Sequence, residues 1–251
     1  MSENSPSHAM VLAAGLGKRM RGADDSLPKP LIPCAGKPLI EHALDRLAAA
    51  GIFSTVVNSH YLGDLLAAHI EDYAKRHPEM AIRLSPEKIL LETGGGVARA
   101  LPHLGAAPFF VLNSDAILDD GASAATAAAA PALARLAQAW DGARMDALLL
   151  LCPPARAVGH SGGGDFRLGD DGRPLRAIGA EDALIFCGVQ LLHPRLFRDA
   201  PSGPYSLNRH YDEAAQAGRL FALEHDGWWY HVGTPEALAE AERRLAPEGG
   251  G

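Results

Sequence analysis

The sequence contains few cysteines and no long hydrophobic run. Its three cysteines, Cys34, Cys152 and Cys187, are far apart and form no C-x-x-C pair, which argues against a disulfide framework and a zinc site. We therefore expect free thiols and a cytoplasmic protein. No apolar run approaches the ~18 residues that cross a bilayer. The first residues are polar and the apolar run after them is short, unlike a secretory signal.

An excess of basic residues is also missing. The formal net charge is -7, and no basic cluster offers a surface for nucleic acid or an anionic membrane. Phosphate ligands would therefore need cations gathered locally at their site. The hydrophobic fraction of 47% is ordinary for a chain with one good core. We expect a flexible tail over residues 1–8 and one domain over 9–247, and the sequence carries no indication of an oligomeric state.

Apolar runs alternate with helical spacing along the first half of the chain. The pattern predicts strands over 10–14, 54–58, 81–84 and 108–115, and helices over 38–50, 62–76 and 95–101. This alternation predicts an α/β, Rossmann-like fold with a mostly parallel central sheet and helices on both faces. Ligands of such sheets bind beyond the carboxyl ends of the strands.

The second half reads less clearly. It predicts strands over 146–152 and 183–192, a helix start near Pro131 in the alanine-rich segment 122–140, and a closing helix over 237–245. Residues 159–176 contain an Asp-Gly step that is typical of a hairpin turn. We expect this β-rich part to form a small insertion beside the main sheet.

A glycine loop follows the first predicted strand. Residues 12–20 read Leu-Ala-Ala-Gly-Leu-Gly-Lys-Arg-Met, and glycines at such a place let backbone N–H groups approach phosphate oxygens. A dinucleotide-binding fingerprint would need glycine where Met20 stands, which also argues against a dinucleotide-dependent oxidoreductase. A P-loop would need Ser or Thr after Gly-Lys, but Arg19 and Pro38 stand there.

The complete string resembles the sugar nucleotidyltransferase family. The loop is followed by Pro-Lys-Pro-Leu at 28–31 and Gly-Lys-Pro-Leu-Ile at 36–40, with Gly-Ala-Asp at 22–24 where the family usually has Pro-Leu-Thr. Further matches lie at 85–87, 91–96, 111–115, 164–168 and 232–238. Among the branches, these segments look most like N-acetylmuramate-1-phosphate uridylyltransferases, with mannose-1-phosphate guanylyltransferases as close relatives.

The resemblance implies a reaction and a set of site residues. A sugar 1-phosphate attacks the α-phosphorus of a nucleoside triphosphate, here expected to be UTP, and pyrophosphate leaves. Arg19 would hold the departing phosphates and Lys29 would stabilise charge near the α-phosphate. The nucleotide would contact Leu12, Ala13, Ala14, Gly15, Gly17, Asn58, Thr93 and Gly94. The small β-rich insertion would bind the sugar, which would contact Glu181, Gly188 and Trp229.

The resemblance also implies a divalent cation. Asp115 would ligate Mg²⁺, which prefers carboxylate, phosphate and water oxygens. The family usually has a second aspartate where this chain has His231, and imidazole suits Mn²⁺, Co²⁺ or Zn²⁺ better than Mg²⁺. His231 could thus ligate a softer ion, Asp115 could hold Mg²⁺ with phosphate and water, or the site could be impaired. The second reading is our expectation.

Two alternatives stay open at this stage. Within the same reaction class, the substrates could be GTP and mannose 1-phosphate. From a different class, the chain could be a non-catalytic sensor of nucleotide or sugar phosphate, an idea supported by His231 and the altered segment 22–24. The retained Arg19, Lys29 and Asp115 favour the enzyme, because a binding module has no need of the full charge-neutralising set.

Overall fold

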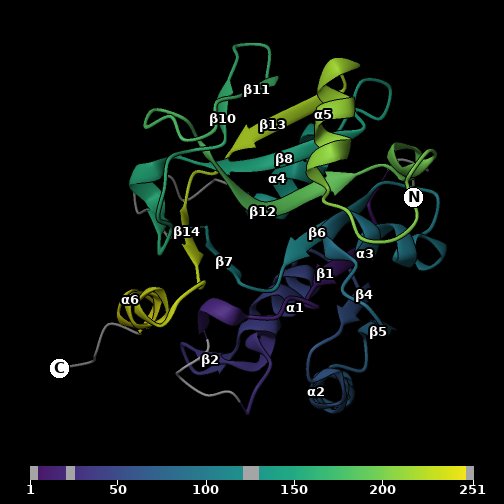
Figure 1. The fold of residues 1–251 in the computed structure, drawn as a ribbon, viewed down its shortest axis with the longest axis vertical. Coiled ribbons are helices and arrows are strands. Elements are labelled where there is room, and N and C mark those ends of the chain that lie inside the picture. The colour runs from purple at the N-terminus through teal and green to yellow at the C-terminus, as the bar shows by residue number, and fades with distance from the viewer. Residues whose placement is uncertain (1–4, 21–25, 121–129, 247–251) are drawn as a thin grey trace.

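A seven-stranded sheet forms the centre of the computed structural model, which describes residues 5–20, 26–120 and 130–246 (Figure 1). The strand order is β13-β8-β12-β6-β1-β4-β5, and β12 runs antiparallel to its neighbours β6 and β8 while the other pairs are parallel. The strands are β1 (His8–Leu12), β4 (Ser54–Ser59), β5 (Ala81–Pro86), β6 (Phe109–Asn113), β8 (Ala147–Cys152), β12 (Ile185–Leu192) and β13 (Leu220–Glu224).

Helices cover both faces of this sheet, as the alternating pattern predicts. On one face α1 (Leu39–Ala49), α2 (Gly63–Arg76) and α4 (Ala132–Ala139) bury an apolar stripe that includes Leu44, Ile70 and Leu136. On the other, α3 (Glu92–Ala100) and α5 (Asn208–Gln216) bury Val97 and Tyr211. Because central strands are covered on both faces, they consist of continuous apolar runs, which explains why the sequence revealed them.

Smaller sheets flank the main one. Strands β7 (Ala116–Asp119), β14 (Trp228–His231) and β9 (Ala157–Val158) form a three-stranded sheet against α6 (Pro235–Leu245). Strands β10 (Phe166–Leu168) and β11 (Pro174–Arg176) form the expected antiparallel hairpin, and Gly172 of its Asp-Gly step has φ +78°. Strands β2 (Pro33–Cys34) and β3 (Lys37–Pro38) close a short hairpin before α1.

Most predicted elements occur with ends shifted by one to three residues, and some predictions are wrong. The helix expected at 95–101 begins at Glu92, so the glycines at 94–96 lie inside it. Strand β1 begins at His8, which the expected tail over 1–8 included. The sequence did not reveal α5, β7, β13 or β14.

Several other expectations fall on residues that the structure does not describe. Residues 1–4 of the expected tail, the altered segment 22–24 and the first part of the alanine-rich segment lie outside the described residues. Among the described helices, none combines the length and apolar character of a membrane span.

Candidate active site

The carboxyl ends of β1, β4 and β6 open into a cavity of about 550 Å³. This is the edge of a parallel sheet at which ligands usually bind, because the loops that follow the strands converge there. The sequence predicted this location. The cavity is lined by residues 12–19, Lys29, Pro30, Asn58, Leu90, Glu92, Thr93, residues 113–115, Ser206 and Gly233.

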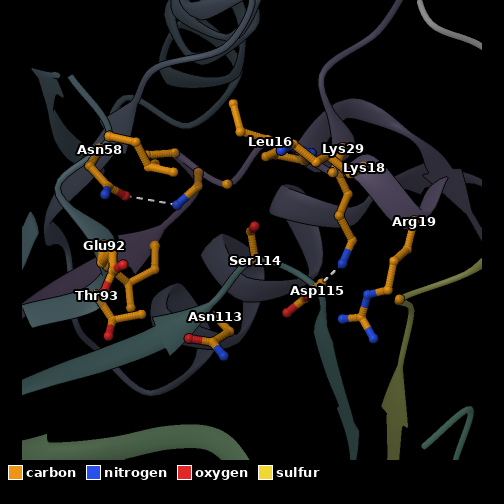
Figure 2. A pocket seen from close by; sticks show the side chains of 18 of the residues that line it. Leu16, Lys18, Arg19, Lys29, Asn58, Glu92, Thr93, Asn113, Ser114 and Asp115 are labelled. Atoms are coloured by element: carbon orange, nitrogen blue, oxygen red, sulfur yellow. Dashed lines mark hydrogen bonds and ion pairs between the residues drawn. The ribbon is translucent and has the colours of Figure 1, made fainter. Parts of the chain in front are cut away.

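Cations gather at one end of the cavity (Figure 2). Lys18 and Arg19 follow the glycine loop, are exposed, and have no hydrogen bond or ion pair to another described residue. Lys29 begins a single 3-10 turn and forms an ion pair with Asp115 at the end of β6. The loop reaches this turn because Gly17 adopts φ +60°, and a Cβ there would lie 3.0 Å from the Cβ of Lys29. The two cation-bearing segments are therefore in direct contact.

Asp115 is ionised at neutral pH. Burial opposes its ionisation, but the neighbouring His231 and the Lys29 ammonium together hold the pKa of this carboxyl well below its usual range. The His231 Nε2 lies 3.7 Å from an Asp115 carboxylate oxygen. The antiparallel pairing of β14 with β7 places His231 opposite Ala116, and it continues in the hydrogen bond of 3.0 Å that Val232 N–H donates to the Asp115 carbonyl. The structure thus brings together Lys29, Asp115 and His231, three residues that lie far apart in the sequence.

A buried side-chain network holds the glycine loop against the start of α3. The Asn58 Oδ1 accepts a hydrogen bond of 2.8 Å from Ala13 N–H, and its Nδ2 donates one of 2.7 Å to Glu87. The other Glu87 oxygen accepts from Leu91 N–H at 2.9 Å. Asn58 lines the cavity, as expected, but its carbonyl oxygen and one amide hydrogen already serve the protein. Glu87 belongs to the matched segment 85–87, but the sequence did not predict its hydrogen bonds to Asn58 and Leu91.

The glycines of α3 serve close packing. A Cβ on Gly94 would lie 2.3 Å from the Tyr205 ring, and one on Gly95 would lie 2.5 Å from the Gly203 carbonyl oxygen. The N–H groups of both Gly94 and Gly95 donate to the Tyr205 carbonyl. Gly94 is buried there and does not line the cavity. Thr93 does line it, although its hydroxyl also accepts a hydrogen bond of 2.9 Å from Leu207 N–H.

The three expected sugar contacts lie outside this cavity. Gly188, at φ +70°, packs under Asn113, a cavity residue, and a Cβ there would lie 2.5 Å from the Asn113 Nδ2. Trp229 is 4% exposed, and its ring stacks on that of His231 with centroids 5.6 Å apart. Glu181 is exposed in the turn before β12. The sugar contacts of these three residues therefore remain predictions. Gly188 borders the cavity only indirectly, because it packs against Asn113.

The cavity residues can bind a hard cation such as Mg²⁺ only if the substrate supplies most of its ligands. Asp115 offers an ionised carboxylate at the cavity wall, and His231 is its nearest partner of ligand type. Among the described residues no group of three or more His, Cys, Asp or Glu side chains gathers as a metal cage would. A single carboxylate completed by phosphate oxygens and water is the usual way in which proteins bind Mg²⁺ with phosphorylated substrates.

Comparison with known proteins assigns this arrangement to a family. Residues 8–140 match the family described as nucleotidyl transferase. The chain belongs to that family. This nucleotidyltransferase is 41% identical to N-acetylmuramate alpha-1-phosphate uridylyltransferase from Caulobacter vibrioides, over 96% of this chain and 98% of that protein. It is 36% identical to the Neisseria meningitidis protein of the same name, over 93% and 96% of the two chains. The family resemblance stated from the motifs is thereby confirmed.

More distant relatives share the architecture. This nucleotidyltransferase is 27% identical to mannose-1-phosphate guanyltransferase from Aspergillus fumigatus, over 91% of this chain and 61% of that protein. The crystal structure of HddC from Yersinia pseudotuberculosis superimposes with a TM-score of 0.72 at 19% identity, covering 95% of this chain and 99% of that chain. At this identity the likeness concerns the fold, and it confirms the Rossmann-like architecture expected from the sequence.

Sequence reasoning missed several residues of the cavity wall. Asn113 and Ser114 directly precede Asp115, so their place at a strand end was a usable signal. Gly233 lies in the matched segment 232–238, two residues after His231, so it could also have been predicted. Ser206 lies on a segment before α5 that carries no motif and reaches the cavity through packing on α3. No pattern in the sequence pointed to it.

Proposed function

We propose that this nucleotidyltransferase transfers UMP from UTP to N-acetylmuramate 1-phosphate and releases pyrophosphate. The observation that carries the proposal is the cationic end of the cavity. Lys18, Arg19 and Lys29 converge there in a protein of net charge -7, beside one ionised carboxylate. A site for several phosphate groups in an acidic protein requires cations close to the phosphates, because the net charge of the protein repels them. Such a reaction would serve the recycling of cell-wall sugars.

The reaction is a displacement at phosphorus. An oxygen of the sugar phosphate forms a bond to the α-phosphorus of UTP, and the bond from that phosphorus to the oxygen bridging the β-phosphate breaks. Arg19 holds the departing pyrophosphate through its planar guanidinium. Lys29 neutralises charge at the α-phosphate while Asp115 holds its ammonium in place. These groups act by positioning and by electrostatic stabilisation, which is the usual basis of phosphoryl and nucleotidyl transfer.

Asp115 would hold the divalent cation, with phosphate oxygens and water as the remaining ligands, and His231 lies 3.7 Å from its carboxylate. A bound Mg²⁺ supplies charge neutralisation between the two phosphorylated substrates. The adjacent imidazole makes Mn²⁺ an acceptable replacement, because nitrogen ligands favour it over Mg²⁺.

The choice of UTP and N-acetylmuramate 1-phosphate is supported by the two relatives of that activity, which align over nearly the whole chain. The mannose-1-phosphate guanyltransferase from Aspergillus fumigatus is 27% identical over 91% of this chain, and it extends well beyond the aligned region. Residues Leu12 to Gly17 lie against the nucleotide in this proposal, since they line the cavity and lead to its cationic end at Lys18 and Arg19.

The test is pyrophosphate release from five nucleotides paired with two sugar phosphates. UTP, GTP, dTTP, CTP and ATP are each combined with N-acetylmuramate 1-phosphate and with mannose 1-phosphate, in Mg²⁺ and separately in Mn²⁺. We expect the highest kcat/KM with UTP and N-acetylmuramate 1-phosphate, in both metals. A maximum with GTP and mannose 1-phosphate would keep the reaction class and overturn the substrates. Binding of nucleotide without any pyrophosphate release would support the alternative that the protein is a non-catalytic sensor.

A further inference from the structure

Glu92 adopts a backbone conformation that its side chain disfavours. It is the first residue of α3 and has φ +58°, in the left-handed region that glycine occupies without strain. Ala35 and Leu62 are the other non-glycine residues with positive φ in the described part of the chain, and neither lines the cavity. Strain of this kind concentrates at binding sites, where a particular side chain is needed despite the backbone.

The Glu92 carboxylate is available to a ligand. The residue is exposed and lines the cavity, and its carboxylate has no hydrogen bond or ion pair to another described residue. Its neighbours differ in this respect: Asn58 and Glu87 are buried and bonded to each other, and the Thr93 hydroxyl already accepts from Leu207. Glu92 is thus the acidic side chain of the cavity that the protein itself leaves without a counter-charge, whereas Asp115 is paired with Lys29.

Its place in the cavity indicates which part of a nucleotide it meets. Figure 2 shows Glu92 and Thr93 on one side of the cavity and Lys18, Arg19 and Lys29 on the other. A triphosphate is attracted to the cations and repelled by a carboxylate. A nucleotide with its phosphates at the cationic end therefore brings its base toward Glu92.

We propose that Glu92 is a specificity-determining residue whose carboxylate accepts a hydrogen bond from the ring N–H of the nucleotide base. This inference rests on the proposed function, because it assumes that the cavity binds a nucleoside triphosphate. Uracil and thymine present N3–H, and guanine presents N1–H, whereas cytosine and adenine present a lone pair at the corresponding ring nitrogen. An ionised carboxylate is acceptor only, so it binds the first group of bases and repels the second.

The experiment compares Glu92→Gly and Glu92→Gln with the unmodified protein. Glycine removes the carboxylate and relieves the positive φ, so Glu92→Gly folds and melts at the same or a higher temperature. Glutamine offers both an acceptor and a donor, so it accepts from uracil and donates to cytosine. Ala35→Gly is the matched control, since it relieves the same backbone strain at an exposed position away from the cavity.

Two readouts are taken: kcat/KM for UTP and CTP with the sugar phosphate, and calorimetric binding of UTP, dUTP and CTP without it. We expect Glu92→Gly to lower the preference for UTP over CTP by about tenfold or more, because a hydrogen bond to a charged group is lost. The loss appears mainly in KM, since the base lies away from the reacting phosphorus. Glu92→Gln lowers the same preference by raising the affinity for CTP, and Ala35→Gly leaves it unchanged.

Other outcomes overturn the proposal in distinguishable ways. An unchanged UTP-to-CTP ratio in Glu92→Gly means that the carboxylate does not read the base. A changed ratio of UTP to dUTP, with the UTP-to-CTP ratio preserved, assigns Glu92 to the ribose instead. If the unmodified protein binds nucleotide with the expected preference but releases no pyrophosphate, the proposed function fails while the role of Glu92 stands. Absence of any nucleotide binding overturns both.

Discussion

Lys29 and Asp115 place opposite charges at the wall of a cavity that otherwise collects cations. The pair is largely buried, with side chains 13% and 23% exposed, so each charge stabilises the other more strongly than on an open surface. A phosphate that enters the cavity competes with Asp115 for the ammonium. The ion pair orients the Lys29 ammonium before substrate binds, which is the form of preorganisation that lowers the barrier for charged transition states.

Replacing Lys29 by Gln tests this assignment. We expect Lys29→Gln to lower kcat for pyrophosphate release by about 10²–10³-fold, the usual loss for one preorganised electrostatic contact. The matched control is Lys37→Gln, because Lys37 also pairs with a carboxylate, that of Asp45, but does not line the cavity. An equal loss in both variants, or near-normal turnover in Lys29→Gln, would contradict the role given to Lys29.

For individual residues, the sequence predicted the charged members of the cavity wall better than the small or apolar ones. Arg19, Lys29 and Asp115 line the cavity together, because a charged side chain next to a glycine loop or at a buried strand end has few other reasons to be there. Gly94 packs on Tyr205 and Trp229 lies buried against His231, so the substrate contacts expected of these two residues stay predictions. Glycines and tryptophans serve close packing as often as binding, and only the partner residues distinguish the two.

Among the structural elements, β4 controls the shape of the cavity through Asn58. Its side chain joins the loop after β1 to Glu87, which in turn holds the segment before α3. The pairing of β1, β4 and β5 brings these three segments together, and the buried hydrogen bonds hold the loops beyond the strand ends. Buried polar groups that lose a partner carry the full cost of desolvation.

Removing this side chain should affect stability and binding together. We expect Asn58→Ala to lower the free energy of unfolding by about 1–3 kcal/mol, because the Ala13 N–H and Glu87 lose their partner. For a chain of this size that corresponds to roughly 2–12 °C in Tm, measured by thermal unfolding. Asn208→Ala is the control, since Asn208 is exposed and bonds only the exposed Arg176 through its side chain. A Tm equal to that of the control would show that the network is dispensable.

The helices and strands were predictable where their side chains form a continuous buried run or stripe. Strands β6 and β8 are apolar runs because both faces are covered, and α1 and α2 show a clear apolar stripe. Helix α5 is largely polar and contributes only a few buried side chains, so no stripe marked it. Strand β14 is four residues long and pairs with β7 and β9, remote partners that no local pattern reveals.

For the molecule as a whole, strand order explains why the site lies where it does. From β1 the chain adds β4 and β5 on one side and β6 on the other (Figure 1). The cavity lies where the strand order changes direction, at the carboxyl ends of β1 and β6, and the segments that follow these two strands line it together. The alternation of strands and helices predicted the sheet, but not this order, because strand order depends on long-range pairing. The local pattern also could not predict that β12 pairs with β6 in the antiparallel direction.

The central claim is that a sugar phosphate oxygen attacks the α-phosphorus of UTP in this cavity, and labelled oxygen tests it most directly. The protein is incubated with UTP and with N-acetylmuramate 1-phosphate whose phosphate carries ¹⁸O, and the products are weighed by mass spectrometry. The account predicts that the whole label is found in the nucleotide sugar and none in pyrophosphate. Label in pyrophosphate, or UTP breakdown without a nucleotide sugar, would contradict it.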